Sequence, residues 1–374
     1  MVLRALAWGS LALIGWTHVG YPLAAAAAAR VRRYRPRLDD DFVADVALVI
    51  AAHDEEDAIR DRIENALRLD YPHGRLEILV ASDGSSDGTG EIVDSFGDLR
   101  VRLLDLPRMG QVAAQNAGVG ATTSEVVAFT DANSSWEPDA LRKLVRNLAD
   151  PEVAYVCGRL QLEDAGNGAN REGLYWSYEL WLREQESMCG SITAGNGGIY
   201  AVRRSAFVEL EPGRSHDLGL PYRLRRRGLR SVYDPRARAR EKGLPTSQAE
   251  WPRKVRMLSQ AWGEVLSGGL ADPRGQPPLY FAALVSHRVI RYATGPLHLV
   301  LFGATAFLAR RDGAARALFG AQLAFLATAA IGRKRPDAPV AGAAWYYLVV
   351  TAASVAGLAR SLRRGPETTW TPQR

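Results

Sequence analysis

The sequence predicts an α/β fold, in which a doubly wound sheet is flanked by apolar helices at both ends of the chain. Three apolar runs, at 47–52, 76–80 and 126–129, each lead into a polar turn and then into a segment with helical character. Such alternation is typical of parallel strands connected by helices. Long apolar segments before residue 30 and after residue 292 indicate further helices outside the sheet. Because ligands of open α/β sheets bind at the carboxyl ends of the strands, the polar turns predict where the site lies.

The turn after the second run is the most informative, because it reads Ala-Ser-Asp-Gly-Ser-Ser-Asp-Gly-Thr from Ala81 to Thr89. Asp83 stands at the end of the strand, where a carboxylate can accept a hydrogen bond from a nucleobase N–H. The glycines allow a tight turn, and the serines and the second aspartate can cap the helix that follows. Taken alone, the segment is also compatible with an ordinary polar turn.

The other two turns are polar as well. The first strand leads into Ala52-His53-Asp54-Glu55-Glu56, and the third ends in Asp131-Ala132-Asn133. Carboxylates and amides at the ends of three such strands favour a nucleotide-binding sheet.

Together these motifs resemble those of the family 2 glycosyltransferases, which have a strand ending near Asn-Glu, then Asp-Gly-Ser-Ser-Asp-Gly-Thr, then Asp-x-Asp. The stretch RMGQVAAQNAG from Arg108 to Gly118 is similar to the family's Gly-Lys-x-x-Ala-Leu-Asn-x-Gly. The resemblance covers residues 45–257 and keeps the order of the motifs. It implies an A-type glycosyltransferase fold with a Rossmann-like mixed sheet, inverting transfer, and a nucleotide-sugar donor, with a uridine diphosphate sugar as the expected one.

The resemblance also assigns the donor side of the site. Its expected donor-binding residues are Ala52, His53, Glu55, Asp83, Gly110, Gln111, Asp131, Asn133 and Arg256. Asp131 matches the first Asp of Asp-x-Asp and is the expected ligand of Mg²⁺ or Mn²⁺, which would neutralise the leaving diphosphate. Asn133 occupies the second position, where an amide oxygen can coordinate the metal without adding charge. The alternative is that this pair only caps a helix.

The family's general base is the Asp of a Glu-Asp motif that opens a helix, and the matching string here is Ser215-His216-Asp217-Leu218. We therefore expect Asp217 to take the proton of the acceptor hydroxyl. His216 replaces the usual Glu and either tunes this carboxylate or donates to a phosphate or the acceptor. The expected acceptor-binding residues are Gly195, Asn196, Gly197 and His216. Without the family context, an Asp at a helix start is most often a cap.

Two further positions depart from the family pattern. The usual Gln-x-x-Arg-Trp is here Arg253-Lys254-Val255-Arg256-Met257, which keeps Arg256 as a clamp for the diphosphate but lacks the Trp. The missing stacking surface argues against processive polymerisation. A basic, membrane-facing helix is the alternative for this string. Gln111 stands where a Lys is frequent and lessens the positive charge near the donor.

Composition favours a membrane-bound enzyme. The chain has 374 residues, a net charge of +6 and two cysteines, which argues against a disulfide framework and fits a reducing compartment. The basic residues cluster beside apolar segments, so membrane lipids and a nucleotide diphosphate are the expected partners and nucleic acid is not.

The amino-terminal segment 2–29 is long and apolar enough to cross a bilayer. Five arginines follow it between residues 30 and 37, which places the next domain on the cytoplasmic side by the positive-inside rule. A cleaved signal peptide is the alternative, but its apolar core is usually shorter and is not followed by a basic flank.

The carboxyl-terminal part contains three candidate spans, at 292–309, 314–331 and 340–359. Residues 279–291 mix apolar and basic side chains, as expected of a helix on a membrane surface. The number of crossings stays open, and the alternative is a helical bundle in a soluble protein.

These observations predict a multi-pass protein of the inner or plasma membrane with a cytoplasmic catalytic domain. The expected parts are a transmembrane helix at 1–29, a basic linker at 30–44, the glycosyltransferase domain at 45–250, interfacial helices at 251–291, transmembrane segments at 292–362 and a basic tail at 363–374. The expected activity is transfer of a sugar to a lipid-linked or glycan acceptor in cell-envelope polysaccharide or glycolipid synthesis. The alternatives are a catalytically silent nucleotide-sugar-binding scaffold and a nucleotidyltransferase, which the acidic first turn disfavours.

Overall fold

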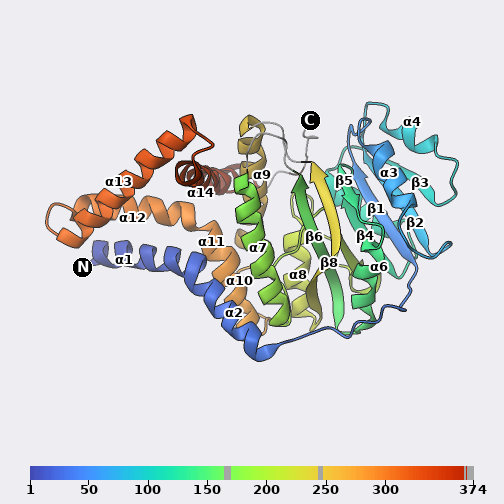
Figure 1. The fold of residues 1–374 in the computed structure, drawn as a ribbon, viewed down its shortest axis with the longest axis horizontal. Helices are drawn as coiled ribbons and strands as arrows, with labels where there is room; N and C mark the ends of the chain where they lie inside the picture. The colour runs from blue at the N-terminus through green and yellow to red at the C-terminus, as the bar shows by residue number, and fades with distance from the viewer. Residues whose placement is uncertain (164–169, 243–246, 366–367, 369–374) are drawn as a thin grey trace.

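The computed structural model describes residues 1–163, 170–242, 247–365 and 368. The chain forms a sheet-based part and a helical part that extends away from it (Figure 1). The predicted basic tail at 363–374 lies largely outside the described residues.

The sheet is mixed, as predicted. Within the described residues its strands are β1 (Val46–Ala52), β2 (Leu76–Asp83), β3 (Val101–Leu106), β4 (Val126–Asp131), β5 (Ser134–Trp136), β6 (Val153–Glu163), β7 (Tyr200–Arg203) and β8 (Arg230–Lys242). Their order is β3-β2-β1-β4-β7-β6-β8-β5. The half formed by β3, β2, β1 and β4 is parallel, whereas β7 runs antiparallel to both of its neighbours. The ends of β1, β2 and β4 therefore meet at one edge of the sheet.

The apolar runs become strands because the sheet is buried on both faces. In β1, Val46, Leu48 and Ile50 pack into one core cluster. The alternate residues Ala47 and Val49 pack into a second cluster on the opposite face. A strand with two buried faces is expected to be continuously apolar rather than alternating. The sequence therefore has no period of two in this segment.

Helices cover both faces of the sheet and connect its strands (Figure 1). The helices of this part are α3 (Ile59–Leu67), α4 (Thr89–Asp94), α5 (Gln111–Gly120), α6 (Ala140–Val145), α7 (Asn170–Met188) and α8 (His216–Arg226), with 3₁₀ turns η2 (Arg146–Ala149) and η3 (Arg204–Ala206). The turns before α4, α5 and α8 are the segments that the sequence singled out. They place the amino ends of α4 and α5 beside the strand ends.

The remaining elements form the helical part. They are α1 (Val2–Gly15), the π-helical segment η1 (Trp16–Gly20), α2 (Tyr21–Arg32), α9 (Ser247–Leu266), α10 (Pro278–Leu284), the π-helical segment η4 (Val285–Val289), α11 (Ile290–Tyr292), α12 (Thr294–Leu308), α13 (Gly313–Lys334) and α14 (Pro339–Arg364). Among the described residues, three helices are long and apolar enough to cross a membrane: Val2–Arg32, Gly313–Lys334 and Pro339–Arg364. The intervening α12 is apolar but shorter.

Close contacts join the helices that can span a membrane to α9 and to α7. The helix α14 packs closely on α9, where a Cβ on Gly357 would lie 2.9 Å from the backbone of Leu258, and Trp262 Nε1 donates to the carbonyl of Ser354 at 3.1 Å. The amino-terminal helix packs on α7, where Tyr21 Oη donates to Glu186 Oε1 at 2.6 Å. The amino-terminal helix is thus joined to α7, which packs on β8, and α14 is joined to α9.

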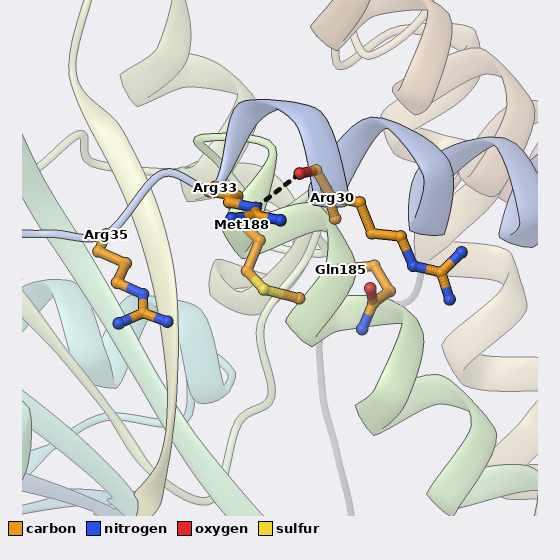
Figure 2. A pocket seen from close by; sticks show the side chains of 6 residues that line it. Arg30, Arg33, Arg35, Gln185 and Met188 are labelled. Atoms are coloured by element: carbon orange, nitrogen blue, oxygen red, sulfur yellow. Dashed lines mark hydrogen bonds between the residues drawn. The ribbon is translucent and has the colours of Figure 1, made fainter.

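The amino-terminal helix ends in a basic rim. Arg33 has a left-handed backbone with φ 46° and ends α2, and its Nε donates to the carbonyl of Arg30 at 2.8 Å. A shallow pocket of about 220 Å³ lies here, and Figure 2 shows Arg30 and Arg35 extending away from each other at its rim. Divergent, exposed arginines suit the headgroup region of a membrane better than a catalytic site.

Candidate active site

One cavity of about 490 Å³ collects most of the predicted site residues. Those that line it are Glu55, Gln111, Asp131, Asn133, Gly195, Asn196, Gly197, His216, Asp217 and Arg256. They come from the ends of β1 and β4, from the starts of α5 and α8, from the segment before β7, and from α9. The other four, Ala52, His53, Asp83 and Gly110, are buried and are not part of this lining in the described chain.

Asp83 holds a loop in place. Its carboxylate accepts hydrogen bonds from the backbone N–H groups of Met109, at 2.6 Å, and Gly110, at 2.9 Å. A close approach is possible because Gly84 has a φ of 61° and no Cβ, which would otherwise lie 2.8 Å from the backbone nitrogen of Arg108. The carboxylate therefore positions the start of α5. Its predicted role in reading a nucleobase stays a prediction.

Asp131 is the centre of an acidic group. It ends β4 and accepts a hydrogen bond from Gln111 Nε2 at 3.0 Å. Burial, and then the nearby charges of Glu241, Asp217 and Glu55, together raise the pKa of its carboxyl to about 7. The carboxyl groups of Asp131, Glu241, Asp217 and Glu55 thus lie near one another.

No sequence motif points to Glu241. It belongs to β8 and reaches the site because β5 pairs with β8, which sets Ser134 opposite Glu241. Asn133 Nδ2 donates to Glu241 Oε1 at 3.2 Å. This pairing joins residues that are far apart in the chain, so no local motif could have indicated it.

The donor set suits a divalent cation that is only partly held by protein. Among the described residues, no three His, Cys, Asp or Glu side chains converge as a ready-made metal site. Mg²⁺ is commonly bound by one or two carboxylates, with phosphates and water as the remaining ligands. Burial and the neighbouring carboxylates disfavour the charged form of Asp131, and a bound cation would stabilise that form. The residues present therefore fit such an ion.

Asp217 lies at the start of α8, as predicted. Leu218 N donates to its Oδ1 at 3.0 Å, Ser215 Oγ donates to the same oxygen, and its backbone carbonyl accepts from Gly195 N at 2.7 Å. Among the described residues, these side-chain hydrogen bonds go to Oδ1 alone. The second carboxylate oxygen therefore keeps its capacity to accept a proton.

His216 is buried, with 3% of its surface exposed. Its Nδ1 lies 3.0 Å from Tyr200 Oη and its Nε2 lies 3.2 Å from Asn116 Oδ1. Burial, and then the charge of Arg223, lower its pKa to about 3. The ring is therefore neutral at physiological pH, and it links α8 to β7 and α5. A role in acceptor binding would require it to give up one of these partners.

The glycine segment before β7 is tightly packed. A Cβ on Gly195 would collide with the hydroxyl of Tyr155, and one on Gly197 would lie 3.6 Å from Asp131 Oδ2. The Asn196 side chain donates to the carbonyl of Gly158 at 2.7 Å and accepts from Ile199 N at 3.1 Å. The segment thus runs beside Asp131 at one end and contacts Asp217 at the other.

The opposite wall of the cavity belongs to the helical part. Arg253, Lys254 and Met257 of α9 line it together with Tyr346 and Val350 of α14, and Lys254 Nζ donates to Tyr346 Oη at 3.0 Å. Sequence reasoning did not place α14 at the site. A helix that can span a membrane therefore contributes directly to the cavity.

Comparison with known proteins gives three findings. Residues 47–210 match the family described as Glycosyl transferase family 2. The Beta-monoglucosyldiacylglycerol synthase of Trichormus variabilis is 26% identical over 270 residues, which cover 68% of this chain and 57% of that protein. The Poly-beta-1,6-N-acetyl-D-glucosamine synthase of Staphylococcus aureus is 25% identical over 241 residues, covering 62% and 58%. The chain thus spans less than two thirds of either relative.

A solved structure is similar over nearly the whole length. The mannosyltransferase PcManGT from Pyrobaculum calidifontis, in complex with GDP-Man and Mn²⁺, superimposes with a TM-score of 0.73 at 21% identity. The similarity covers 96% of this chain and 99% of that one, so it includes the helical part as well as the sheet.

Proposed function

We propose that this chain is an inverting glycosyltransferase, because residues 47–210 match glycosyl transferase family 2 and the fold is of the predicted A type. It would move a sugar from a nucleotide-sugar donor, first of all a uridine diphosphate sugar, to a lipid-linked or glycan acceptor. The observation that carries the proposal is the convergence of Asp131 and Asp217 on a cavity that also contacts α14. The relatives' names, a glycolipid synthase and a polysaccharide synthase, support both acceptor classes.

On the donor side, Asp131 and Asn133 would hold Mg²⁺ or Mn²⁺. The bound ion would neutralise charge that develops on the leaving diphosphate. The similar mannosyltransferase was solved with Mn²⁺, which supports a divalent ion here. Arg256 would add a guanidinium group to the phosphates, and Gln111 orients Asp131 through their hydrogen bond.

On the acceptor side, Asp217 would act as the general base. The acceptor oxygen attacks the anomeric carbon while the bond from that carbon to the phosphate oxygen breaks and leaves its electrons on the diphosphate. The hydroxyl proton passes to Asp217, whose Oδ1 is already held by Ser215 and Leu218. We assign His216 a positioning role, because its ring nitrogens are engaged by Tyr200 and Asn116.

The membrane arrangement follows from the helices and the charges. We propose a multi-pass protein of the inner or plasma membrane, with the segments divided as the sequence predicts. The arginines between residues 30 and 37 would keep the sheet-based part on the cytoplasmic side.

The competing function is a silent scaffold that binds nucleotide sugars without transferring them. Its supporting observation is that Asn133 stands in place of a carboxylate and donates its amide to Glu241.

A donor screen with the detergent-purified chain separates the two functions. Nucleotide sugars are offered with Mg²⁺, Mn²⁺ or a chelator, and release of the nucleoside diphosphate is measured in the presence of membrane lipid extract. The transferase predicts metal-dependent release from one donor. Donor binding without release under all of these conditions would favour the scaffold.

A further inference from the structure

A buried tryptophan follows the proposed metal-binding segment. Trp136 ends β5, three residues after Asn133, and 2% of its surface is exposed. No sequence motif assigns a role to it. A buried indole N–H usually has a hydrogen-bond acceptor, and the location of that acceptor shows which parts of the chain the side chain joins.

The indole joins β5 to the glycine segment before β7, residues 195–198. Trp136 Nε1 donates to the carbonyl of Gly198 at 2.9 Å. The two segments pack tightly at this point, because a Cβ on Gly198 would lie 3.0 Å from Ser134 Oγ. One residue earlier, a Cβ on Gly197 would lie 3.6 Å from Asp131 Oδ2. The hydrogen bond therefore holds the two segments together beside the proposed metal ligand.

The backbone of Trp136 is held by α3. Trp136 N donates to Asn65 Oδ1 at 2.8 Å, and Asn65 Nδ2 donates to the carbonyl of Trp136 at 2.9 Å. Because β5 stands last in the strand order, the Asn65 amide forms the pair of bonds that a neighbouring strand would form. Arg62, also on α3, donates to the same Oδ1 and to the carbonyl of Ser134, the latter at 3.3 Å. The strand is thus fixed by α3 as well as by β8.

The glycine segment contacts the proposed base at its other end. Gly195 N donates to the carbonyl of Asp217 at 2.7 Å. Between the two ends, the Asn196 side chain donates to the carbonyl of Gly158 at 2.7 Å and accepts from Ile199 N at 3.1 Å. A segment braced in this way moves as a unit, so we expect a displacement at its β5 end to reach the residue that contacts Asp217.

We propose that Trp136 is a positioning residue, which sets the separation between the metal-bound donor at Asp131 and the base Asp217. It is not part of the cavity lining in the described chain, and it acts through Gly198 on one side and β5 on the other. Direct attack requires the acceptor oxygen to be aligned with the anomeric carbon, and a misplacement of about 1 Å can lower the rate by about 10²-fold. This inference rests on the proposed function, because it assigns a residue to the same reaction.

Trp136→Phe tests the proposal, because it keeps an aromatic ring in the core and removes the indole N–H. The matched control is Trp262→Phe. Trp262 is 6% exposed and donates from Nε1 to the carbonyl of Ser354 at 3.1 Å, but among the described residues it does not line the cavity. Both variants lose an indole-to-carbonyl hydrogen bond, so both should have a lower midpoint of thermal unfolding.

The kinetic constants separate positioning from stability. With the donor identified by the screen, Trp136→Phe should lower kcat for sugar transfer by about tenfold or more, while binding of uridine diphosphate with Mn²⁺ changes by less than about twofold. Trp262→Phe should keep the kcat of the wild-type chain. Loss of stability alone would lower the folded fraction of both variants and leave kcat per folded molecule unchanged.

A second variant tests the same connection from α3. Asn65→Asp keeps the acceptor for Trp136 N but cannot donate to the carbonyl of Trp136, so it should also lower kcat. Because both residues act through β5, the double variant should lose less activity than the product of the two single losses.

The contrary outcomes are distinct from failure of the proposed function. Equal kcat values for Trp136→Phe and Trp262→Phe would overturn the positioning role, as would weaker nucleotide binding with an unchanged kcat. Either result leaves the transferase in place, since the wild-type chain transfers sugar in the same assay. Absence of transfer by the wild-type chain would remove the proposed function and this inference with it.

Discussion

The two walls of the cavity have opposite charge. On the sheet side, burial and then the charges of Glu241, Asp217 and Glu55 raise the pKa of Asp131 to about 7. On the other side, Arg183 of α7, Arg288 of η4 and the basic residues Arg253, Lys254 and Arg256 of α9 line the same space. Acidic side chains suit a bound cation, and basic side chains suit a bound anion. A metal ion beside the acidic wall and the phosphates of the donor beside Arg256 would match these charges.

The largest expected effect on activity comes from replacing the proposed base, which lies between the two walls. Asp217→Asn keeps the shape of the side chain and its contacts with Ser215 and Leu218, but it cannot take a proton. We expect transfer to fall by about 10²- to 10⁴-fold with donor binding unchanged, as measured by product formation and nucleotide titration. The exposed Asp61→Asn is the control. Normal transfer by Asp217→Asn would remove this residue from the mechanism.

The second largest effect on activity is expected from replacing Asp131, at the centre of the acidic wall. Asp131→Asn deletes the expected metal ligand, so we expect the metal dependence of donor binding to disappear and transfer to fall by about 10²-fold or more. Titration of uridine diphosphate with and without Mn²⁺ measures the first effect. If Mn²⁺ strengthens nucleotide binding in the variant as it does in the wild-type chain, the metal is held elsewhere.

The pH dependence of the free energy of unfolding gives a second test of the buried carboxyl group of Asp131. The pKa of Asp131 is raised from 3.8 to about 7, so between these values the folded metal-free chain holds a proton that the unfolded chain has lost. The free energy of unfolding of the metal-free chain should therefore fall as the pH rises through this window. Asp131→Asn should lose this part of the pH dependence, and added Mn²⁺ should raise the unfolding midpoint most at about pH 8. Thermal unfolding followed at about pH 5 and about pH 8 checks both.

A substitution at His216 tests whether its neutral ring serves only to hold neighbouring residues in place. His216→Gln leaves Tyr200 and Asn116 imperfectly paired, so we expect a loss of about 1–3 kcal/mol of stability and a moderate loss of kcat. Because the pKa of His216 lies near 3, the activity profile between about pH 5 and about pH 8 should keep its shape. A shape that changes in this variant would mean that the ring titrates during the reaction.

The smallest expected change is a gain. Asn133→Asp restores a carboxylate to the acidic wall, next to Glu241, and should strengthen Mn²⁺ binding by about tenfold because the metal gains a charged ligand. In the absence of metal the same variant should be less stable than the wild-type chain above pH 7. Calorimetric titration of Mn²⁺ measures the gain, and weaker binding would exclude residue 133 as a ligand.

Local patterns predicted the acidic wall better than the basic one. Asp131 and Asp217 stand at strand and helix ends that a motif of a few residues defines, and the structure brings them into one cavity. Glu241 depends on the pairing of β5 with β8, and Arg183 and Arg288 depend on how α7 and η4 pack around residues 193–195. Such contacts join segments that are distant in the chain, and burial of an isolated arginine leaves no periodic signal. The same reason explains why the sequence indicated apolar helices after residue 292 but not that α14 would line the cavity.

The anomeric configuration of the product tests the central claim most directly. The transferred sugar is examined by proton NMR after a single round of reaction with the identified donor and a lipid acceptor. A single displacement assisted by Asp217 predicts a product whose anomeric configuration is opposite to that of the donor. A product with the donor's own configuration would contradict the account, because it would require a mechanism other than one direct attack with Asp217 as the base.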